Sequence, residues 1–159
     1  MTVAADDARI RGRRVWLRAL ESADLPAYKA AANSVEVGAW AGYPWPMSDA
    51  SVERWFARVQ ERHGDGEYWF AISPLGSDEF VGTVWLWSKG SRLDGLELSV
   101  FVTEEAGLGR GTGSDAIDAA LDFIFGSDET ERVWLTTEAE NGRALRAFEK
   151  CGFQVDGTI

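Results

Sequence analysis

Cysteine is almost absent from this sequence, since Cys151 is the only one among 159 residues. An internal disulfide is therefore impossible, and the single histidine, His63, cannot complete a zinc site with one cysteine. Basic residues are also few, with 16 Lys and Arg against 26 Asp and Glu and a net charge of -10. Since no Cys/His cluster exists, we expect no structural metal. Because such a surface repels a phosphate backbone, we expect no nucleic-acid partner.

Long apolar runs are missing as well. No uninterrupted apolar segment reaches the length needed to cross a bilayer, and residues 1–7 lack the basic flank and apolar core of a secretory signal. We therefore expect no membrane association and a cytoplasmic location. A content of 45% hydrophobic and 26% charged residues favours one soluble domain with a substantial core over residues 1–159.

The order of the predicted elements indicates an α/β fold. In chain order they are a strand at 15–20, helices at 22–33 and 48–62, strands at 68–73, 80–88 and 96–102, a helix at 113–125, a strand at 132–137 and a helix at 141–150. The three middle strands are expected to form an antiparallel meander, and the last part a βαβ unit. Gly126 stands where a left-handed helix cap belongs, and Gly152 closes the last helix.

A glycine-rich turn lies between the strand at 96–102 and the helix at 113–125. Its residues are Leu108, Gly109, Arg110, Gly111, Thr112 and Gly113. Glycines allow positive φ and close backbone approach, and the free N–H groups of a helix start face an anion. A Walker loop is excluded because its terminal Gly-Lys-Ser/Thr is absent, and the dinucleotide G-x-G-x-x-G lacks its last glycine. A structural turn into a helix is the competing interpretation.

This turn resembles the Q/R-x-x-G-x-G/A pyrophosphate loop of the GNAT superfamily of acyltransferases. Gly111 and Gly113 fit its glycine positions, Leu108 replaces the usual Gln or Arg, and Arg110 can compensate near a phosphate. Residues 141–153 resemble the second signature of the family, N-x-x-(A/S)-x-x-x-(Y/F)-x-K-x-G-F. The resemblance covers residues 13–153 and implies a mixed, centrally splayed sheet flanked by about four helices, with acetyl-coenzyme A as acyl donor.

The same resemblance assigns the cofactor contacts. The backbone of residues 100–102 (Val100, Phe101 and Val102) is expected to pair with the pantetheine arm, the 108–113 turn to bind the pyrophosphate, and Asn141 and Phe148 to contact the cofactor. Without the resemblance, Asn141 is a helix N-cap and Phe148 a core aromatic. Many relatives carry a tyrosine at the Phe148 position that protonates the departing thiolate, so that acid is absent here.

Direct acyl transfer needs a neutral amine, and therefore a group that accepts its proton. Glu97 is the candidate base, because many relatives carry a catalytic glutamate in the strand before the glycine turn; an ordinary outward strand residue is the alternative. The candidate walls of the acceptor site are aromatic, and core packing is the competing interpretation for them. They are Trp40, Tyr43, Trp45 and Trp85. The Gly-Tyr-Pro-Trp-Pro segment at 42–46 resembles the Rim type, the ribosomal-protein N-terminal acetyltransferases.

The leading hypothesis is an N-acetyltransferase that moves an acetyl group from acetyl-coenzyme A to a primary amine by direct attack in a ternary complex, without a metal. The acceptor is an amine-bearing small molecule or a protein N-terminus. The alternatives are a non-catalytic acyl-coenzyme A sensor or degenerate module, and a purely structural domain. The family normally adds a strand hairpin after the Gly152-Phe153 pair, so we expect a longer chain or a strand from the partner in a homodimer.

Overall fold

A mixed sheet forms the centre of the molecule in a computed structural model that describes residues 9–34, 46–88, 95–103, 111–127 and 130–158. The strands are β1 (Ile10–Arg11), β2 (Val15–Ala19), β3 (Glu67–Pro74), β4 (Gly82–Trp87), β5 (Leu96–Val102) and β6 (Val133–Trp134), in this spatial order. Neighbours from β1 to β5 are antiparallel, whereas β5 and β6 are parallel. The predicted meander is confirmed.

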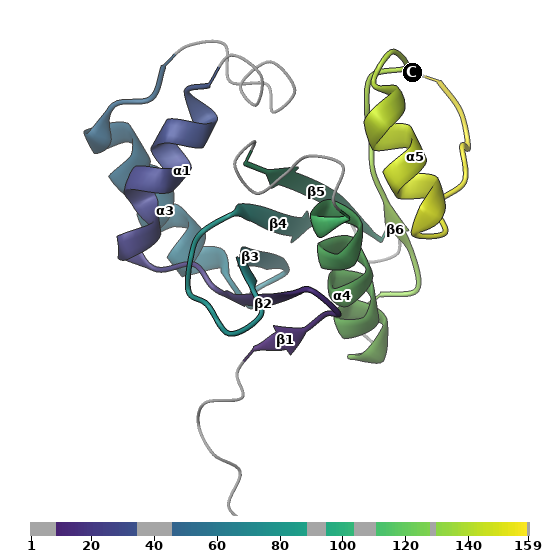
Figure 1. Cartoon of the computed structure of the whole chain (residues 1–159), viewed down its shortest axis with the longest axis horizontal. Coiled ribbons are helices and arrows are strands. Elements are labelled where there is room, and N and C mark those ends of the chain that lie inside the picture. The colour runs from purple at the N-terminus through teal and green to yellow at the C-terminus, as the bar shows by residue number, and fades with distance from the viewer. Residues whose placement is uncertain (1–8, 35–45, 89–94, 104–110, 128–129, 159) are drawn as a thin grey trace, which may run out of the picture.

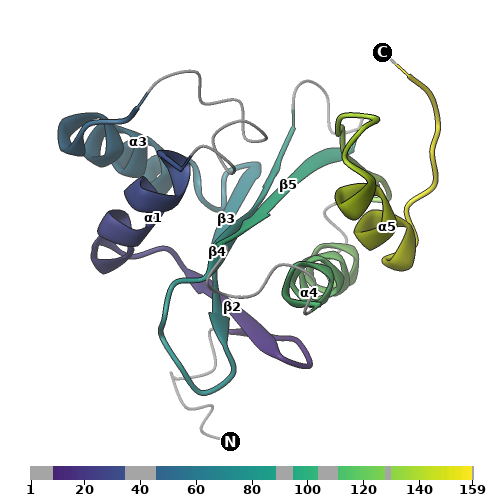
Figure 2. The ribbon, with the colours of Figure 1, turned by 45° about the horizontal axis from the view of Figure 1, so that its top comes forward.

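Helices cover both faces of this sheet. They are α1 (Leu25–Ala32), which follows the short 3-10 helix η2 (Ser22–Asp24), α3 (Asp49–Arg62), α4 (Thr112–Gly126) and α5 (Gly142–Lys150). Figures 1 and 2 show α1 and α3 on one face, α4 on the other, and α5 beside α4 at the β6 end of the sheet. The β5-α4-β6 segment is the predicted βαβ unit, so the α/β fold is confirmed. Within the described ranges, no helix has the length and apolarity that a membrane span requires.

The helix ends follow the capping residues in most places. The Ser48 side chain accepts a hydrogen bond from Ser51 N, and the Asn141 side chain accepts one from Ala144 N, as expected of N-caps. The predicted left-handed cap at Gly126 is wrong, because Gly126 is the last residue of α4 and Ser127 follows in the right-handed region. The N–H and hydroxyl of Ser127 satisfy two carbonyls of the last turn, which removes the need for positive φ.

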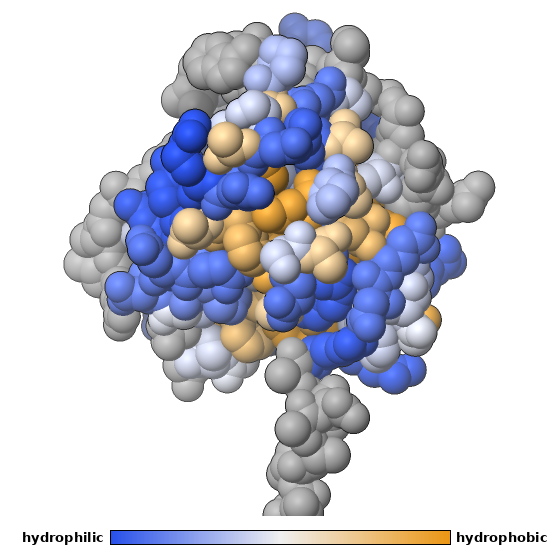
Figure 3. All heavy atoms as spheres, turned by 90° about the vertical axis from the view of Figure 1, so that its left-hand side faces the viewer, coloured by the Kyte–Doolittle hydropathy of each residue, from blue (hydrophilic) through white to orange (hydrophobic). Residues whose placement is uncertain are grey.

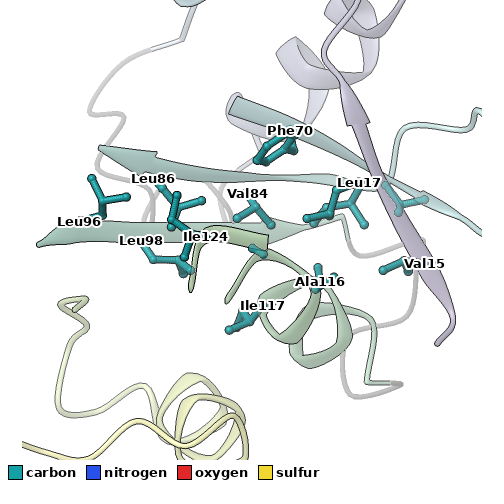
Figure 4. Close-up of a cluster of buried hydrophobic side chains, with 14 residues drawn as sticks. Val15, Leu17, Phe70, Val84, Leu86, Leu96, Leu98, Ala116, Ile117 and Ile124 are labelled. Carbon is teal, nitrogen blue, oxygen red and sulfur yellow. The ribbon is translucent and has the colours of Figure 1, made fainter. Parts of the chain in front are cut away.

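Two hydrophobic cores flank the sheet. The first lies between α4 and the sheet, where Ile117 and Ile124 pack against strand residues such as Leu86 and Leu98 (Figure 4). The second lies under α1 and α3 and is built around Tyr28 and other aromatic side chains. Burial of each large apolar side chain stabilises the fold by about 1.5–3 kcal/mol. On the surface of the α1 and α3 side, hydrophilic residues surround a smaller hydrophobic area (Figure 3).

The two-residue side-chain period of β5 divides its residues between these cores. Leu96 and Leu98 face α4 and are buried there, and Val100 and Val102 pack against the same cluster. The residues between them face α1 and α3, since Phe101 packs against the second cluster. β5 therefore places Glu97 on the aromatic side of the sheet.

The parallel β6 is shorter than the predicted strand at 132–137. Its ladder with β5 has two residue pairs, Leu96 with Val133 and Glu97 with Trp134. At its start Gly95 has a φ of 79°, and a Cβ there would lie 2.3 Å from the carbonyl oxygen of Arg132. Only glycine allows this close approach, so the two strands can meet at this end. The ladder between them ends after the second pair.

Candidate functional site

The separation of β5 from β6 opens one edge of β5. On its other side, β5 pairs with β4 from Glu97, opposite Trp87, to Val102, opposite Gly82. In the part of the chain that the structure describes, no ladder joins residues 98–102 to the segment after Trp134. Because a strand directs backbone groups to both sides, the edge of β5 at Val100, Phe101 and Val102 presents N–H and C=O groups to the gap.

The start of α4 lies against the end of this open edge. Gly111 is the N-cap, with a φ of 82°, and its carbonyl accepts the first helical hydrogen bond from Asp115 N. A Cβ on Gly113 would lie 3.6 Å from Cγ2 of Val102, so the first turn packs on the last residue of β5. The N–H groups of Thr112 and Gly113 belong to the turn that no helical carbonyl satisfies. Leu108, Gly109 and Arg110 lie outside the described residues.

Helix α5 lies beside the first turn of α4. The Asn141 Oδ1 accepts from Ala144 N at 3.2 Å, which confirms its role as a cap. Phe148 is half-buried, packs against the α4 core and contacts Phe153 edge-on, with ring centroids 6.1 Å apart. At the end of α5 the Cys151 thiol donates to the carbonyl of Ser114 at 3.4 Å. Burial, followed by the nearby Asp118 carboxylate, raises the pKa of this thiol to about 11.

Glu97 is buried, with 5% of its surface exposed, so the outward-facing alternative for it is wrong. In backbone register it lies between Trp87 of β4 and Trp134 of β6. Glu67 of β3 is the other register neighbour of Trp87. A carboxylate thus lies within an aromatic surface, at the level where β5 and β6 separate.

The aromatic surface around it is a continuous stack. Trp85 packs face to face with Trp69 at 4.4 Å and with Trp87 at 3.6 Å between ring centroids. Trp69 meets Trp55 edge-on at 5.1 Å, and Trp55 stacks on Tyr28 at 3.9 Å. Both faces of Trp85 are therefore covered by other indoles, as core packing predicts. Trp40, Tyr43 and Trp45 lie outside the described residues.

Two features of the structure were not predicted from the sequence. The buried indole nitrogens of Trp69 and Trp85 have no hydrogen-bond acceptor among the described residues. Asp115 is buried in the first turn of α4 and contacts the turn between β1 and β2. The available sequence signal was an acidic residue beside Ala116 and Ile117 on the apolar face of a helix.

Over the described ranges, no group of three or more His, Cys, Asp or Glu side chains could bind a metal.

Proteins related in sequence match a short stretch of the chain. The kanamycin resistance protein of Rhizobium radiobacter is 33% identical over 52 residues, which are 33% of this chain and 48% of that protein. The aminoglycoside N(6')-acetyltransferase type 1 of Klebsiella pneumoniae is also 33% identical over 52 residues, 33% of this chain and 26% of that protein. The chain thus matches about half or less of the length of these relatives.

Solved structures match nearly the whole chain. An acetyltransferase from Agrobacterium tumefaciens has a TM-score of 0.77 at 22% identity, over 98% of this chain and 89% of that one. The spermidine N-acetyltransferase of Vibrio cholerae, solved with CoA and spermine, has a TM-score of 0.76 at 23% identity, over 91% and 83%. RimL, a ribosomal L7/L12 α-N-protein acetyltransferase, has a TM-score of 0.75 at 15% identity, over 94% and 82%. At these identities the likeness shows a common fold.

A family model described as an acetyltransferase (GNAT) domain matches residues 14–154 of this chain. That range includes every strand from β2 to β6, the glycine turn and α5. It contains the open edge of β5 and the start of α4 that meets it. This chain belongs to the GNAT acetyltransferase family.

Proposed function

We propose that this protein transfers an acetyl group from acetyl-coenzyme A to a primary amine, by direct attack within a ternary complex. One observation carries the proposal: the edge of β5 opens beside the glycine start of α4, with the buried Glu97 at the level where β5 and β6 separate. An edge without a ladder partner among the described strands and a helix start provide donors for an extended, phosphate-bearing ligand.

The residues present fit coenzyme A in their chemistry. The first-turn N–H groups of α4, from Thr112 onward, would bind the pyrophosphate, together with the 108–110 segment. The backbone of Val100, Phe101 and Val102 would pair with the pantetheine arm. Asn141 and Phe148 would flank that arm from α5, whose end is joined to the start of α4 by the Cys151 hydrogen bond. Positive φ at Gly111 directs the chain into the helix without a side chain at the phosphates.

In the reaction, Glu97 would accept a proton from the amine, either directly or through a water molecule. The neutral nitrogen then attacks the thioester carbonyl, the new C–N bond forms, and the C–S bond breaks. A backbone N–H of β5 would stabilise the carbonyl oxygen as its negative charge grows. Phe148 has no proton to donate, so the departing thiolate takes its proton from solvent or from the substrate nitrogen.

The acceptor that suits this surface best is a cationic amine. The net charge of -10 attracts cations, and indole rings bind ammonium groups. Relatives named for aminoglycoside and spermidine acetylation act on molecules of this kind. Trp40, Tyr43 and Trp45 are proposed as acceptor walls, whereas Trp85, whose faces are covered by Trp69 and Trp87, is proposed to support the aromatic stack.

The test is a thiol-release assay with acetyl-coenzyme A and four acceptor classes: polyamines, aminoglycosides, peptide N-termini and small amino compounds. Acceptor-dependent thiol release supports the proposal. Calorimetric binding of coenzyme A without thiol release in any class would identify an acyl-coenzyme A sensor instead. Absence of both would leave a structural domain.

A further inference from the structure

The Asp115 carboxylate connects the start of α4 to the turn between β1 and β2. Its Oδ1 accepts from Arg13 N at 3.0 Å, and its Oδ2 accepts from Arg14 N at 2.7 Å and Val15 N at 3.0 Å. The residue is 4% exposed. These three backbone donors come from residues about 100 positions earlier in the chain, so the contact is entirely tertiary.

The turn fits closely around this carboxylate. A Cβ on Gly12 would lie 2.6 Å from the Asp115 Oδ2 and 2.9 Å from the Val15 carbonyl oxygen, distances that real Cβ atoms do not show. The Gly12 N–H also donates to that carbonyl at 2.8 Å. Any larger residue at position 12 would therefore push the turn away from α4.

Electrostatics alone does not explain a carboxylate here in a cofactor-binding protein. A negative charge one turn inside α4 reduces the positive potential that attracts a phosphate. Burial raises the pKa of Asp115, but hydrogen bonds from the backbone N–H groups of Arg14, Arg13 and Val15 outweigh it and lower the pKa overall. The group is therefore ionised at neutral pH, and its charge is balanced by the turn and by the Arg13 guanidinium, 3.5 Å away.

We propose that Asp115 is a positioning residue that fixes the first turn of α4 against the β1–β2 turn and thereby aims its N–H groups at the cofactor pyrophosphate. This inference rests on the proposed function. Asp115 fixes the turn from the β2 side, and the hydrogen bond from Cys151 to Ser114 fixes it from the α5 side. A helix start constrained on two sides keeps its donors preorganised, which lowers the entropy that binding must overcome.

The main variant is Asp115→Asn, whose size is unchanged but whose amide NH₂ would face backbone N–H groups that need acceptors. We expect the Kd for coenzyme A, measured by calorimetry, to rise about tenfold. Removal of a negative charge near the helix start would by itself tighten anion binding, so weaker binding is the signature of lost positioning. Asp24→Asn is the matched control, because Asp24 is a buried carboxylate bonded to Arg18, in the other core.

Asp24→Asn is expected to reduce stability and to leave the Kd for coenzyme A within about twofold, well below its unfolding temperature. Gly12→Ala is a second variant that disturbs the same contact without changing any charge, and it too should weaken coenzyme A binding. Wild-type affinity in either Asp115→Asn or Gly12→Ala would overturn the inference. An equal loss of affinity in Asp24→Asn would show general destabilisation and overturn it as well. Failure of the wild-type chain to bind coenzyme A would instead overturn the proposed function.

Discussion

At the scale of single residues, the position of Glu97 matters most for chemistry. It lies on one side of Trp87 in register, and Glu67 lies on the other. The two carboxylates differ in environment, because Glu97 is buried whereas Glu67 forms an ion pair with Arg62 at 2.8 Å. Glu97 therefore lies in the proposed site, and Glu67 lies beside it.

Glu97→Gln should lower kcat by about 100-fold or more while the Kd for coenzyme A changes little, because a general base acts on the amine and not on the cofactor. Steady-state kinetics with calorimetry measures both quantities. Glu67→Gln is the control and should keep kcat within about twofold, since Glu67 lies outside the proposed site and the loss of its ion pair with Arg62 costs little stability. Unchanged turnover in Glu97→Gln would remove this residue from the mechanism.

Cys151 should react slowly with thiol reagents. Burial and the nearby Asp118 carboxylate raise its pKa to about 11, which keeps it protonated at neutral pH, and only the thiolate is nucleophilic. We expect iodoacetamide labelling of the folded protein at pH 7.5 to be roughly two to three orders of magnitude slower than that of a free cysteine. Mass spectrometry against time measures the rate, and labelling as fast as that of glutathione would contradict the assignment.

His63 should make stability depend on pH. Its Nδ1 accepts a hydrogen bond from Trp69 N at 3.1 Å, which requires this nitrogen to be unprotonated, and burial lowers the pKa of the ring. The unfolded chain, with a pKa of about 6.5 for histidine, therefore binds more protons than the folded protein at lower pH. Stability is complete above about pH 6.5 and declines as the pH falls.

Urea denaturation at steps from pH 7.5 to 5.5 measures this effect as a decrease in the free energy of unfolding. His63→Asn keeps an acceptor for Trp69 N but does not titrate, so its curve should be flatter over the same interval. Equal slopes for the two proteins would show that the dependence comes from other groups.

At the scale of elements, the sequence predicted those features that depend on interactions within a single helix or strand. Ser48 and Asn141 were recognised as caps because an N-cap needs only its own helix. β6 was overestimated because Leu135 to Thr137 have strand propensity but no ladder partner there among the described strands. β1 was missed because its two residues depend on the turn that Asp115 contacts.

In the candidate site too, features encoded by short motifs were predicted, whereas features that depend on neighbouring strands were not. The family pattern predicted the open edge of β5 and the glycine start of α4, because short motifs encode both. The burial of Glu97 was not predictable, since it depends on the neighbouring strands and on the register with Trp87 and Trp134. The stacked position of Trp85 likewise depends on Trp69, a residue of another strand.

The buried ion pair that joins β2 to η2 should contribute strongly to the stability of the fold. The Arg18 guanidinium bonds both carboxylate oxygens of Asp24 and the Ser73 hydroxyl, and the Arg18 and Asp24 side chains are nearly fully buried. Asp24→Asn should lower the free energy of unfolding by about 3–5 kcal/mol, because it removes the closest carboxylate from a buried guanidinium. Denaturant titration measures the loss. The exposed pair of Lys29 and Asp49 is the comparison, and Asp49→Asn should cost less than about 1 kcal/mol.

At the scale of the whole molecule, coenzyme A should act as a stabilising ligand. A ligand that binds the folded state at 100 times its Kd adds about 2.7 kcal/mol, which for a domain of this size raises Tm by about 5–10 °C. Differential scanning fluorimetry over a coenzyme A series measures the shift. Adenosine at the same concentrations is the control and should have a smaller effect, since it lacks the pyrophosphate and pantetheine groups. An unchanged Tm at saturating coenzyme A would contradict binding.

The two-pair join between β5 and β6 has a consequence for the lifetime of the protein. None of the residues of α5 is fully buried, and among the described residues β6 is attached to the sheet by two ladder pairs and by the hydrogen bond from Leu96 N to the Arg132 carbonyl. The segment from β6 to α5 should therefore open at a lower free energy than the sheet does. Proteases cut such open segments first, and a cofactor that bridges β5 and α5 would close them. On the proposed function, degradation would then slow as the supply of acetyl-coenzyme A rises, so that the protein persists where its proposed acyl donor is abundant.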